Sequence, residues 1–332
     1  MHLEGSLSPQ LLFQLASKHN IPLPASDPAF TSPDTLLLRY ENFTSLDDFL
    51  HYYYLGMSTL IDEADFEALA WEYFVRAKSE GVVHAEVFFD PQGHETRGIS
   101  YHTVVSGFNK ACVRARTELD LSNELIVCFL RHLPALDADR VFKLSTPDIQ
   151  SGLIKGIGLD SSEVGNPPAI FKDTYLEAES LGFKRTMHAG EEASVDYMVE
   201  ALDVCHVQRM DHGIKLTESP SFLQRVADAK IMVTICPLSN VRLRCLKHVS
   251  ELPLREYLDA GVIFSLNSDD PAYFGGHILE NYCQVQAAFK FGIQDWAKIV
   301  KGSVEGSWCS QERKTEILGL LEGVMEKYKD LK

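Results

Sequence analysis

Short apolar runs rich in β-branched and aromatic residues alternate with helical patterns along this chain, and this alternation is the strongest constraint on its fold. The seven runs are HAEVFFD (84–90), ELIVCFLR (124–131), LIKGIGLD (153–160), KRTMHAG (184–190), VQRMDHG (207–213), KIMVTICP (230–237) and VIFSLNSDD (262–270). Alternating strands and helices are typical of parallel strands joined by right-handed crossovers. We therefore expect an α/β fold built on a parallel sheet.

Helical patterns with recognisable stop signals lie between and before these runs. In residues 62–80, apolar side chains recur at i, i+3 and i+4 spacing, and Gly81 follows as a stop. The other expected helices are 8–18, 168–180, 194–204, 219–229, 252–260, 277–291 and 311–330, the last two of which close the chain. Because two helices precede the first run, a further strand is expected at the front, ending near His2, with most of it missing upstream of Met1.

Eight strand–helix units close into a (βα)8 TIM barrel, whereas seven do not close well. An open doubly wound sheet is the alternative, but no GxGxxG or GxxxxGK[ST] motif follows any expected strand. One barrel accommodates 332 residues, and neither a repeat nor a linker rich in Pro, Gly or Ser divides them. We therefore predict a single (βα)8 barrel domain over residues 1–332, with its first strand largely missing.

The net charge and the cysteine content indicate which classes of partner the protein can bind and in which cellular compartment it is expected. The formal charge of −16 disfavours nucleic acids and anionic membranes, and no apolar run is long enough to span a bilayer. The seven cysteines form no CxxC pair, which favours free thiols in a reducing compartment. We expect a cytoplasmic protein that acts on a small molecule; the sequence leaves its oligomeric state open.

The carboxyl ends of three expected strands carry side chains suited to chemistry: HAGE (188–191), DHG (211–213) and SDD (268–270). Each segment alone also fits a structural role, as a hydrogen-bonded histidine, a turn glycine or a helix-capping aspartate. Barrel active sites form at these strand ends, so the three segments should meet. Imidazoles and carboxylates gathered with few cations are costly unless a cation binds, and this donor set favours zinc.

Four motifs in the same strand order resemble the adenosine/adenine deaminase family: HLEGSL (2–7), HAGE (188–191), DHG (211–213) and SLNSDDP (265–271). The match runs from residue 1 to about residue 310. Segments such as HAEVFFDPQ, GLDSSE and TICPLSNV are most similar to the adenine deaminases of fungal and bacterial type, which act on the free base. The resemblance implies a zinc-dependent (βα)8 hydrolase that converts adenine to hypoxanthine and ammonia in purine salvage.

The resemblance also implies a metal site in which His2, His188 and Asp269 bind one zinc ion per subunit. The family has one more histidine two positions before His2, where this chain has only Met1. We expect that the chain is truncated there; the alternative is a genuine start and a catalytically inactive purine-binding protein. A second metal bridged by a carbamylated lysine is not expected, because Lys155 lies near the start of its strand.

The catalytic residues implied by the resemblance are Glu191, His212 and Asp270. Glu191 would donate a proton to purine N1, a role that requires a raised carboxyl pKa. His212 would orient the attacking water and help remove its proton. Asp270 would hydrogen-bond the water and the N7 side of the purine.

Substrate choice is predicted to depend on residues at the other end of the purine. Glu4 stands where members acting on adenosine have Asp, an acid associated with the ribose end. Ser162 and Glu163 are predicted to bind the substrate, and Glu163 would accept a hydrogen bond from N9–H of free adenine, which a ribose would block. A solvated loop acid is the alternative for Glu163. Residues 49–60 (FLHYYYLGMSTL) are either a lid over the purine or an ordinary packed helix. Adenosine deaminase remains the alternative function.

Overall fold

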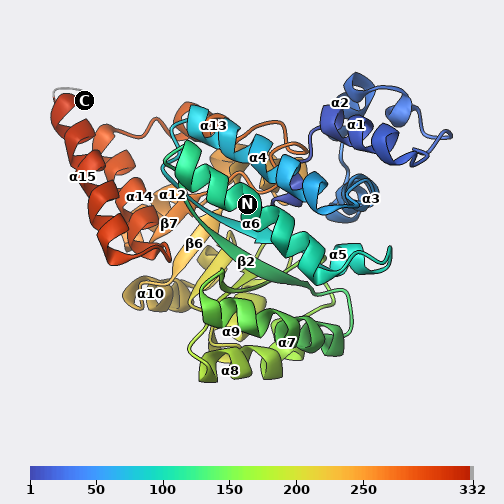
Figure 1. Cartoon of the computed structure of the whole chain (residues 1–332). Coiled ribbons are helices and arrows are strands. Elements are labelled where there is room, and N and C mark those ends of the chain that lie inside the picture. Colours follow the sequence, from blue (N-terminus) through green and yellow to red (C-terminus); the bar gives the residue numbers. More distant parts are fainter. Residues whose placement is uncertain (330–332) are drawn as a thin grey trace.

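The computed structural model describes residues 1–329 as one parallel sheet of seven strands surrounded by helices (Figure 1). The strands are β1 (His84–Phe89), β2 (Ser122–Leu130), β3 (Ile154–Asp160), β4 (Lys184–Ala189), β5 (Arg209–His212), β6 (Met232–Ile235) and β7 (Phe264–Leu266). Each strand pairs in parallel with the next one along the chain. The seven predicted strands and their parallel order are confirmed.

Helices follow the strands and cover the outside of the sheet. They are α1 (Pro9–His19), α2 (Pro33–Tyr40), α3 (Leu46–Met57), α4 (Glu63–Ser79), α5 (Gln92–Glu95), α6 (Tyr101–Glu118), α7 (Ala135–Ser151), α8 (Lys172–Ser180), α9 (Val195–Asp203), α10 (Pro220–Asp228), α11 (Pro237–Arg242), α12 (Leu254–Ala260), α13 (Ile278–Phe289), α14 (Ile293–Gly306) and α15 (Gln311–Lys327). Figure 1 shows α4 and α6 along one side of the strands and α7, α8 and α9 along another. No helix among residues 1–329 is long and apolar enough to cross a membrane.

Helix α14 corrects the prediction that two helices close the chain, because it lies between the two that were expected. Gly302 and Gly306 lower its intrinsic helix propensity, which obscures it in the sequence. They also let the helix approach the sheet closely: a Cβ on Gly306 would come within 2.7 Å of the Met232 Cβ. Tertiary packing therefore outweighs propensity here. The last residues of the helix expected at 311–330 lie outside the described part of the chain.

Helix α4 begins at a capping box that also joins it to α1. Asp62 accepts the Asp65 N–H at 3.2 Å, and the Asp65 carboxylate accepts the Asp62 N–H at 3.0 Å. The same buried carboxylate contacts Lys18 at 2.6 Å and His19 at 2.7 Å, both in the last turn of α1. The capping residues at the start of α4 thus also hold α1 against α4.

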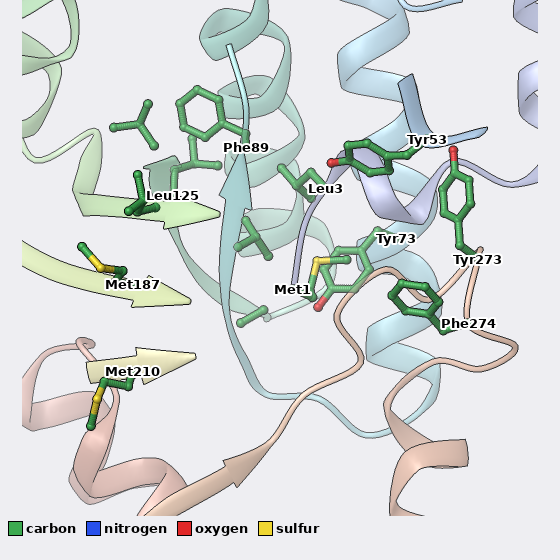
Figure 2. Packing of buried hydrophobic residues seen from close by; sticks show 14 of the residues in the cluster. Met1, Leu3, Tyr53, Tyr73, Phe89, Leu125, Met187, Met210, Tyr273 and Phe274 are labelled. Atoms are coloured by element: carbon green, nitrogen blue, oxygen red, sulfur yellow. The ribbon is translucent and has the colours of Figure 1, made fainter. Parts of the chain in front are cut away.

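The first three residues lie between β1 and β7, the two edge strands of the sheet. Phe88 donates its N–H to the Met1 carbonyl at 2.8 Å, and Leu3 donates to the Phe88 carbonyl at 2.9 Å. On the other side, His2 donates its N–H to the Asp269 carbonyl at 3.1 Å. Figure 2 shows Met1 and Leu3 among buried apolar side chains beside β1. These contacts fix His2 at the carboxyl end of the sheet.

A cavity of about 490 Å³ lies below this bridge, between the unpaired stretches of β1 and β7. Its lining includes Ala85 and Glu86 from β1, and Ser265 and Leu266 from β7. Among the described residues, no strand pairs with either edge along this stretch. The predicted barrel is therefore seen as seven strands plus one bridge, and a longer first strand stays a prediction.

A buried ion pair connects β1 with β5 at the side of this cavity. The Glu86 carboxylate accepts hydrogen bonds from the Arg209 guanidinium and from the Trp308 N–H. Arg209 also lies 3.8 Å over the Trp308 ring. Burial by itself raises the pKa of Glu86, but Arg209 and His84 together lower that pKa to about 2.

We expect Glu86→Gln to lower the free energy of unfolding by about 3–5 kcal/mol at pH 7, because it leaves Arg209 buried without its anion. The folded-state pKa lies below the ordinary 4.5, so the contribution is full above about pH 4.5 and is lost as the pH falls toward 2. Urea unfolding across this range measures it. As a control, Glu124→Gln breaks the half-exposed pair with Lys155 and should cost under about 1 kcal/mol. Equal costs for the two variants would contradict the prediction.

Candidate active site

One cavity at the carboxyl ends of the strands gathers all the residues predicted to bind metal or to catalyse. Those six residues are His2, His188, Glu191, His212, Asp269 and Asp270. The cavity is small, about 40 Å³, and the aromatic side chains Phe49, Tyr53 and Tyr54 of α3 also line it. Residues 49–57 of the segment 49–60 belong to a packed helix whose aromatic side chains line the cavity, and a lid over the purine stays a prediction.

Three buried imidazoles stand in a row along this cavity. The ring centroids of His2 and His188 are 5.1 Å apart, and those of His188 and His212 are 4.8 Å apart. Asp269 faces the row: its oxygens lie 3.5 Å from His2 Nε2 and 3.8 Å from His212 Nε2. Burial, together with the neighbouring imidazoles, lowers the pKa values of His2 and His188. Neutral imidazole is the form that binds a metal ion.

Unusual backbone conformations turn two of these side chains into the cavity. His212 and Asp269 have φ angles of 62° and 56°, in the left-handed region that non-glycine residues rarely occupy. His212 is the last residue of β5, and Asp269 lies three residues beyond the end of β7, so both stand where the chain leaves the sheet. Such strain persists only where surrounding contacts impose it, and it clusters at functional sites.

The donor set fits a divalent metal ion, although the tightest groups differ from the predicted one. Ligand atoms within 4.8 Å of one another form overlapping groups: His188 with Glu191 and His212; His212 with Cys236 and Asp269; and His2 with Asp90 and Asp160. The buried Glu191 Oε1 and Asp270 Oδ1 have no hydrogen-bond partner among the described residues. Buried carboxylates without partners are costly, and a bound cation would offset that cost. The specific trio His2, His188 and Asp269 stays a prediction.

Glu191 has the environment that a proton donor requires. Burial raises the pKa of its carboxyl to about 8, against the opposing effect of His212, whose Nδ1 lies 3.6 Å away. Burial also raises the pKa of Asp270, and the adjacent Asp269 adds to that rise. A carboxyl with a pKa near 8 is mostly protonated at neutral pH and can donate its proton to a substrate nitrogen.

His212 lies between an acid and a predicted metal ligand. Although burial disfavours the imidazolium, the carboxyls of Glu191 and Asp269 raise the pKa of His212 above its ordinary value. The Asn240 amide lies 3.2 Å from His212 Nδ1 and fixes the orientation of the ring. This geometry leaves Nε2 directed toward Asp269, where it can exchange a proton with a water molecule.

Two cavity aspartates were missed by the sequence reasoning, Asp90 after β1 and Asp160 at the end of β3. His2 Nδ1 lies 3.4 Å from Asp160 Oδ2 and 3.9 Å from Asp90 Oδ2, while the Tyr53 hydroxyl donates to Asp90 at 3.1 Å. Burial raises the pKa of Asp90 to about 7. The signal was available, because the runs HAEVFFD and LIKGIGLD both end in aspartate at the edge where the site forms.

Of the four residues predicted to bind substrate, Asp270 lines the cavity, whereas Glu4, Ser162 and Glu163 do not. Glu4 lies behind it, where its carboxylate accepts the Asp90 N–H at 3.0 Å. Ser162 donates to the Asp47 carboxylate at 3.0 Å.

Glu163 is fully buried, so the alternative of a solvated loop acid is wrong. Both of its carboxylate oxygens accept backbone N–H groups of the chain that follows β4. The Glu163 carboxylate is therefore taken up by the backbone that follows β4.

Comparison with known proteins identifies the family of this chain. The family model described as adenosine deaminase matches residues 1–324. The chain belongs to the adenosine deaminase family. The family resemblance predicted from the motifs HLEGSL, HAGE, DHG and SLNSDDP is confirmed.

Relatives within the adenosine deaminase family carry the name adenine deaminase. The protein of that name from Schizosaccharomyces pombe is 52% identical over 99% of this chain and 90% of its own length. The Aspergillus fumigatus protein is 51% identical over 99% of this chain and 94% of its own length. The crystal structure of adenine deaminase from Arthrobacter aurescens is 39% identical, with a TM-score of 0.92 over 98% of this chain and 97% of that one. The barrel fold and the enzyme class are shared with these proteins.

We expect His188→Ala and Asp269→Ala each to weaken zinc binding at least about tenfold, because each removes a predicted ligand of the metal. Elemental analysis after dialysis measures this. Glu191→Gln serves as the control and should retain zinc, since Glu191 is assigned to proton transfer. Full zinc occupancy in both alanine variants would contradict the predicted ligand set.

Proposed function

We propose that this chain is a zinc enzyme that deaminates adenine to hypoxanthine and ammonia, as a step of purine salvage. One observation carries the proposal. The Glu191 carboxyl lines the same buried cavity as His188, His212 and Asp269, and burial raises its pKa to about 8. The curated relatives that share about half of its residues and are named adenine deaminase support the choice of substrate.

The residues that would hold the metal are His2, His188 and Asp269, with one ion per chain. When bound there, zinc would supply Lewis-acid activation of the attacking water. Among the buried acids nearby, Asp160 lies on the opposite side of the His2 ring from Asp269. A carboxylate in that place orients a ligating histidine through its second nitrogen.

Proton transfer and positioning are then assigned to this chain's own groups. His212 accepts the proton of the water that attacks C6, while Glu191 donates a proton to N1 and removes negative charge from the ring. Asp270 hydrogen-bonds the N7 side of the purine. The protonated His212 then gives its proton to the amino group on C6, which leaves as ammonia, and the new C6 hydroxyl returns a proton to Glu191 as it becomes the carbonyl of hypoxanthine.

The size and lining of the cavity favour a free base over a nucleoside. Phe49, Tyr53 and Tyr54 lie over a small space, and flat aromatic surfaces suit a planar purine. A ribose on N9 would need room beyond this small space, which Phe49, Tyr53 and Tyr54 close on one side.

We expect zinc-loaded protein to release ammonia from adenine with a kcat/KM at least about 100-fold above that for adenosine. The reason is that the ribose must displace the aromatic side chains of α3. A coupled ammonia assay with both substrates, at matched zinc content, measures the ratio. Preference for adenosine would reject the base-specific proposal, and the absence of turnover with either substrate would reject the enzyme.

We expect Glu191→Gln to lower kcat for adenine by roughly 10²–10⁴-fold, because an amide cannot donate the N1 proton efficiently. Stopped assays on wild type and variant, with zinc content measured on the same samples, test this. A variant with bound zinc and nearly unchanged kcat would show that another group is the acid.

A further inference from the structure

The chain that follows β4 is held by a single buried carboxylate from a neighbouring loop. Glu163 Oε1 accepts the N–H of Gly190 at 2.7 Å. Its second oxygen accepts the N–H groups of the next three residues, Glu191, Glu192 and Ala193, at 3.0, 2.8 and 2.9 Å. Glu163 has no exposed surface. Four consecutive backbone donors therefore converge on one side chain.

These contacts use both oxygens of the Glu163 carboxylate. Hydrogen bonds from N–H groups to an ionised carboxylate are about twice as strong as those between neutral groups. The loop that they hold is tight: Gly190 has a φ of 73°, and a Cβ there would come within 2.4 Å of the Met198 sulfur. The side chain of Glu191 projects from the middle of this fixed turn into the cavity.

Arg131 completes the arrangement from the end of β2. Its guanidinium is buried and donates to the His188 carbonyl at 2.7 Å and to the Asn166 carbonyl at 3.0 and 2.8 Å. Asn166 in turn donates its N–H to the Glu163 carbonyl at 3.1 Å. One cation thus ties the end of β4 to the loop that carries Glu163, and its charge lies close to that carboxylate.

We propose that Glu163 is a positioning residue, which with Arg131 holds loop 190–193 so that the Glu191 carboxyl is aimed at the substrate. Glu163 does not itself touch the purine. The inference rests on the proposed function, in which Glu191 is the proton donor. In addition, the negative charge of Glu163 contributes to the raised pKa of Glu191. Misplacing a catalytic group by about 1 Å can cost roughly 100-fold in rate.

The substitution Glu163→Gln separates the positioning role from packing, since it keeps the size of the side chain. An amide has one acceptor oxygen, and its NH2 group must face at least one of the four loop N–H donors. Glu163→Asp keeps the charge but shortens the reach by one methylene. Glu218→Gln is the matched control, because Glu218 also accepts a backbone N–H, that of Val195 at 3.1 Å, from a position at the surface.

Hydrogen exchange measured by mass spectrometry on zinc-loaded protein tests the clamp without any assay of turnover. In wild type, the amides of 190–193 should exchange slowly. In Glu163→Gln they should exchange at least about tenfold faster, the change expected for about 1.4 kcal/mol of lost stabilisation. In Glu218→Gln the exchange of these four amides should be unchanged. Rapid exchange of these amides in wild type would overturn the proposal even if the variants failed to fold.

Steady-state kinetics with adenine then distinguishes positioning from substrate contact. With zinc content and folding verified at the assay temperature, Glu163→Gln should lower kcat about 100-fold and change KM less than about threefold. Glu163→Asp should also lose turnover. A higher KM with unchanged kcat and unchanged exchange would overturn the proposal in favour of contact with N9–H. If wild type fails to deaminate adenine, the proposed function fails, while the exchange data still decide the clamp.

Discussion

Desolvation of acidic and imidazole side chains at the carboxyl edge of the parallel sheet is the constraint on which the rest of this site depends. Seven strands run in the same direction, so every strand-end residue is delivered to one edge. Burial there makes charge expensive, which raises the pKa of Glu191 and lowers that of His188. Burial of these side chains is costly for folding. The same burial keeps Glu191 protonated, so that it can donate a proton, and keeps His188 neutral, so that it can bind a metal ion.

The two ends of the sheet offset the cost of buried charge in different ways. At the amino-terminal side, Glu86 and Arg209 neutralise each other directly, and the Arg209 guanidinium lies over the Trp308 ring. At the carboxyl side of the described residues several buried acids lack a basic partner, and the Arg131 guanidinium is directed at backbone carbonyls. A direct ion pair leaves neither charge buried alone, whereas unpaired acids leave ligand atoms available for a metal ion and a substrate.

Backbone N–H groups also offset the cost of burying charged side chains. The N–H groups after β4 meet Glu163, so a buried carboxylate that reads in the sequence as a specificity residue acts as part of the scaffold. Glu4 shows the same pattern, because its carboxylate caps the backbone at Asp90 behind the cavity. Both acids lie in motifs that resemble the family, but their carboxylates accept hydrogen bonds from backbone N–H groups of this chain.

The sequence by itself determined the seven strands, their parallel order, the family and the strand-end residues that meet at the cavity. The strands and their common edge could be predicted because strand periodicity is a local property and parallel strands all end at the same edge. The family followed from the resemblance of the motifs HLEGSL, HAGE, DHG and SLNSDDP. Only the tertiary structure decided where the side chains of Glu163, Glu4 and Ser162 point. The positions of Asp90 and Asp160 at strand ends are visible in the sequence, but their contacts with His2 are seen only in the fold. Likewise α14, with its two glycines, was recognisable only through its packing on β6 and β7. Side-chain direction and close approach depend on contacts between segments far apart in the chain, and no local pattern encodes them.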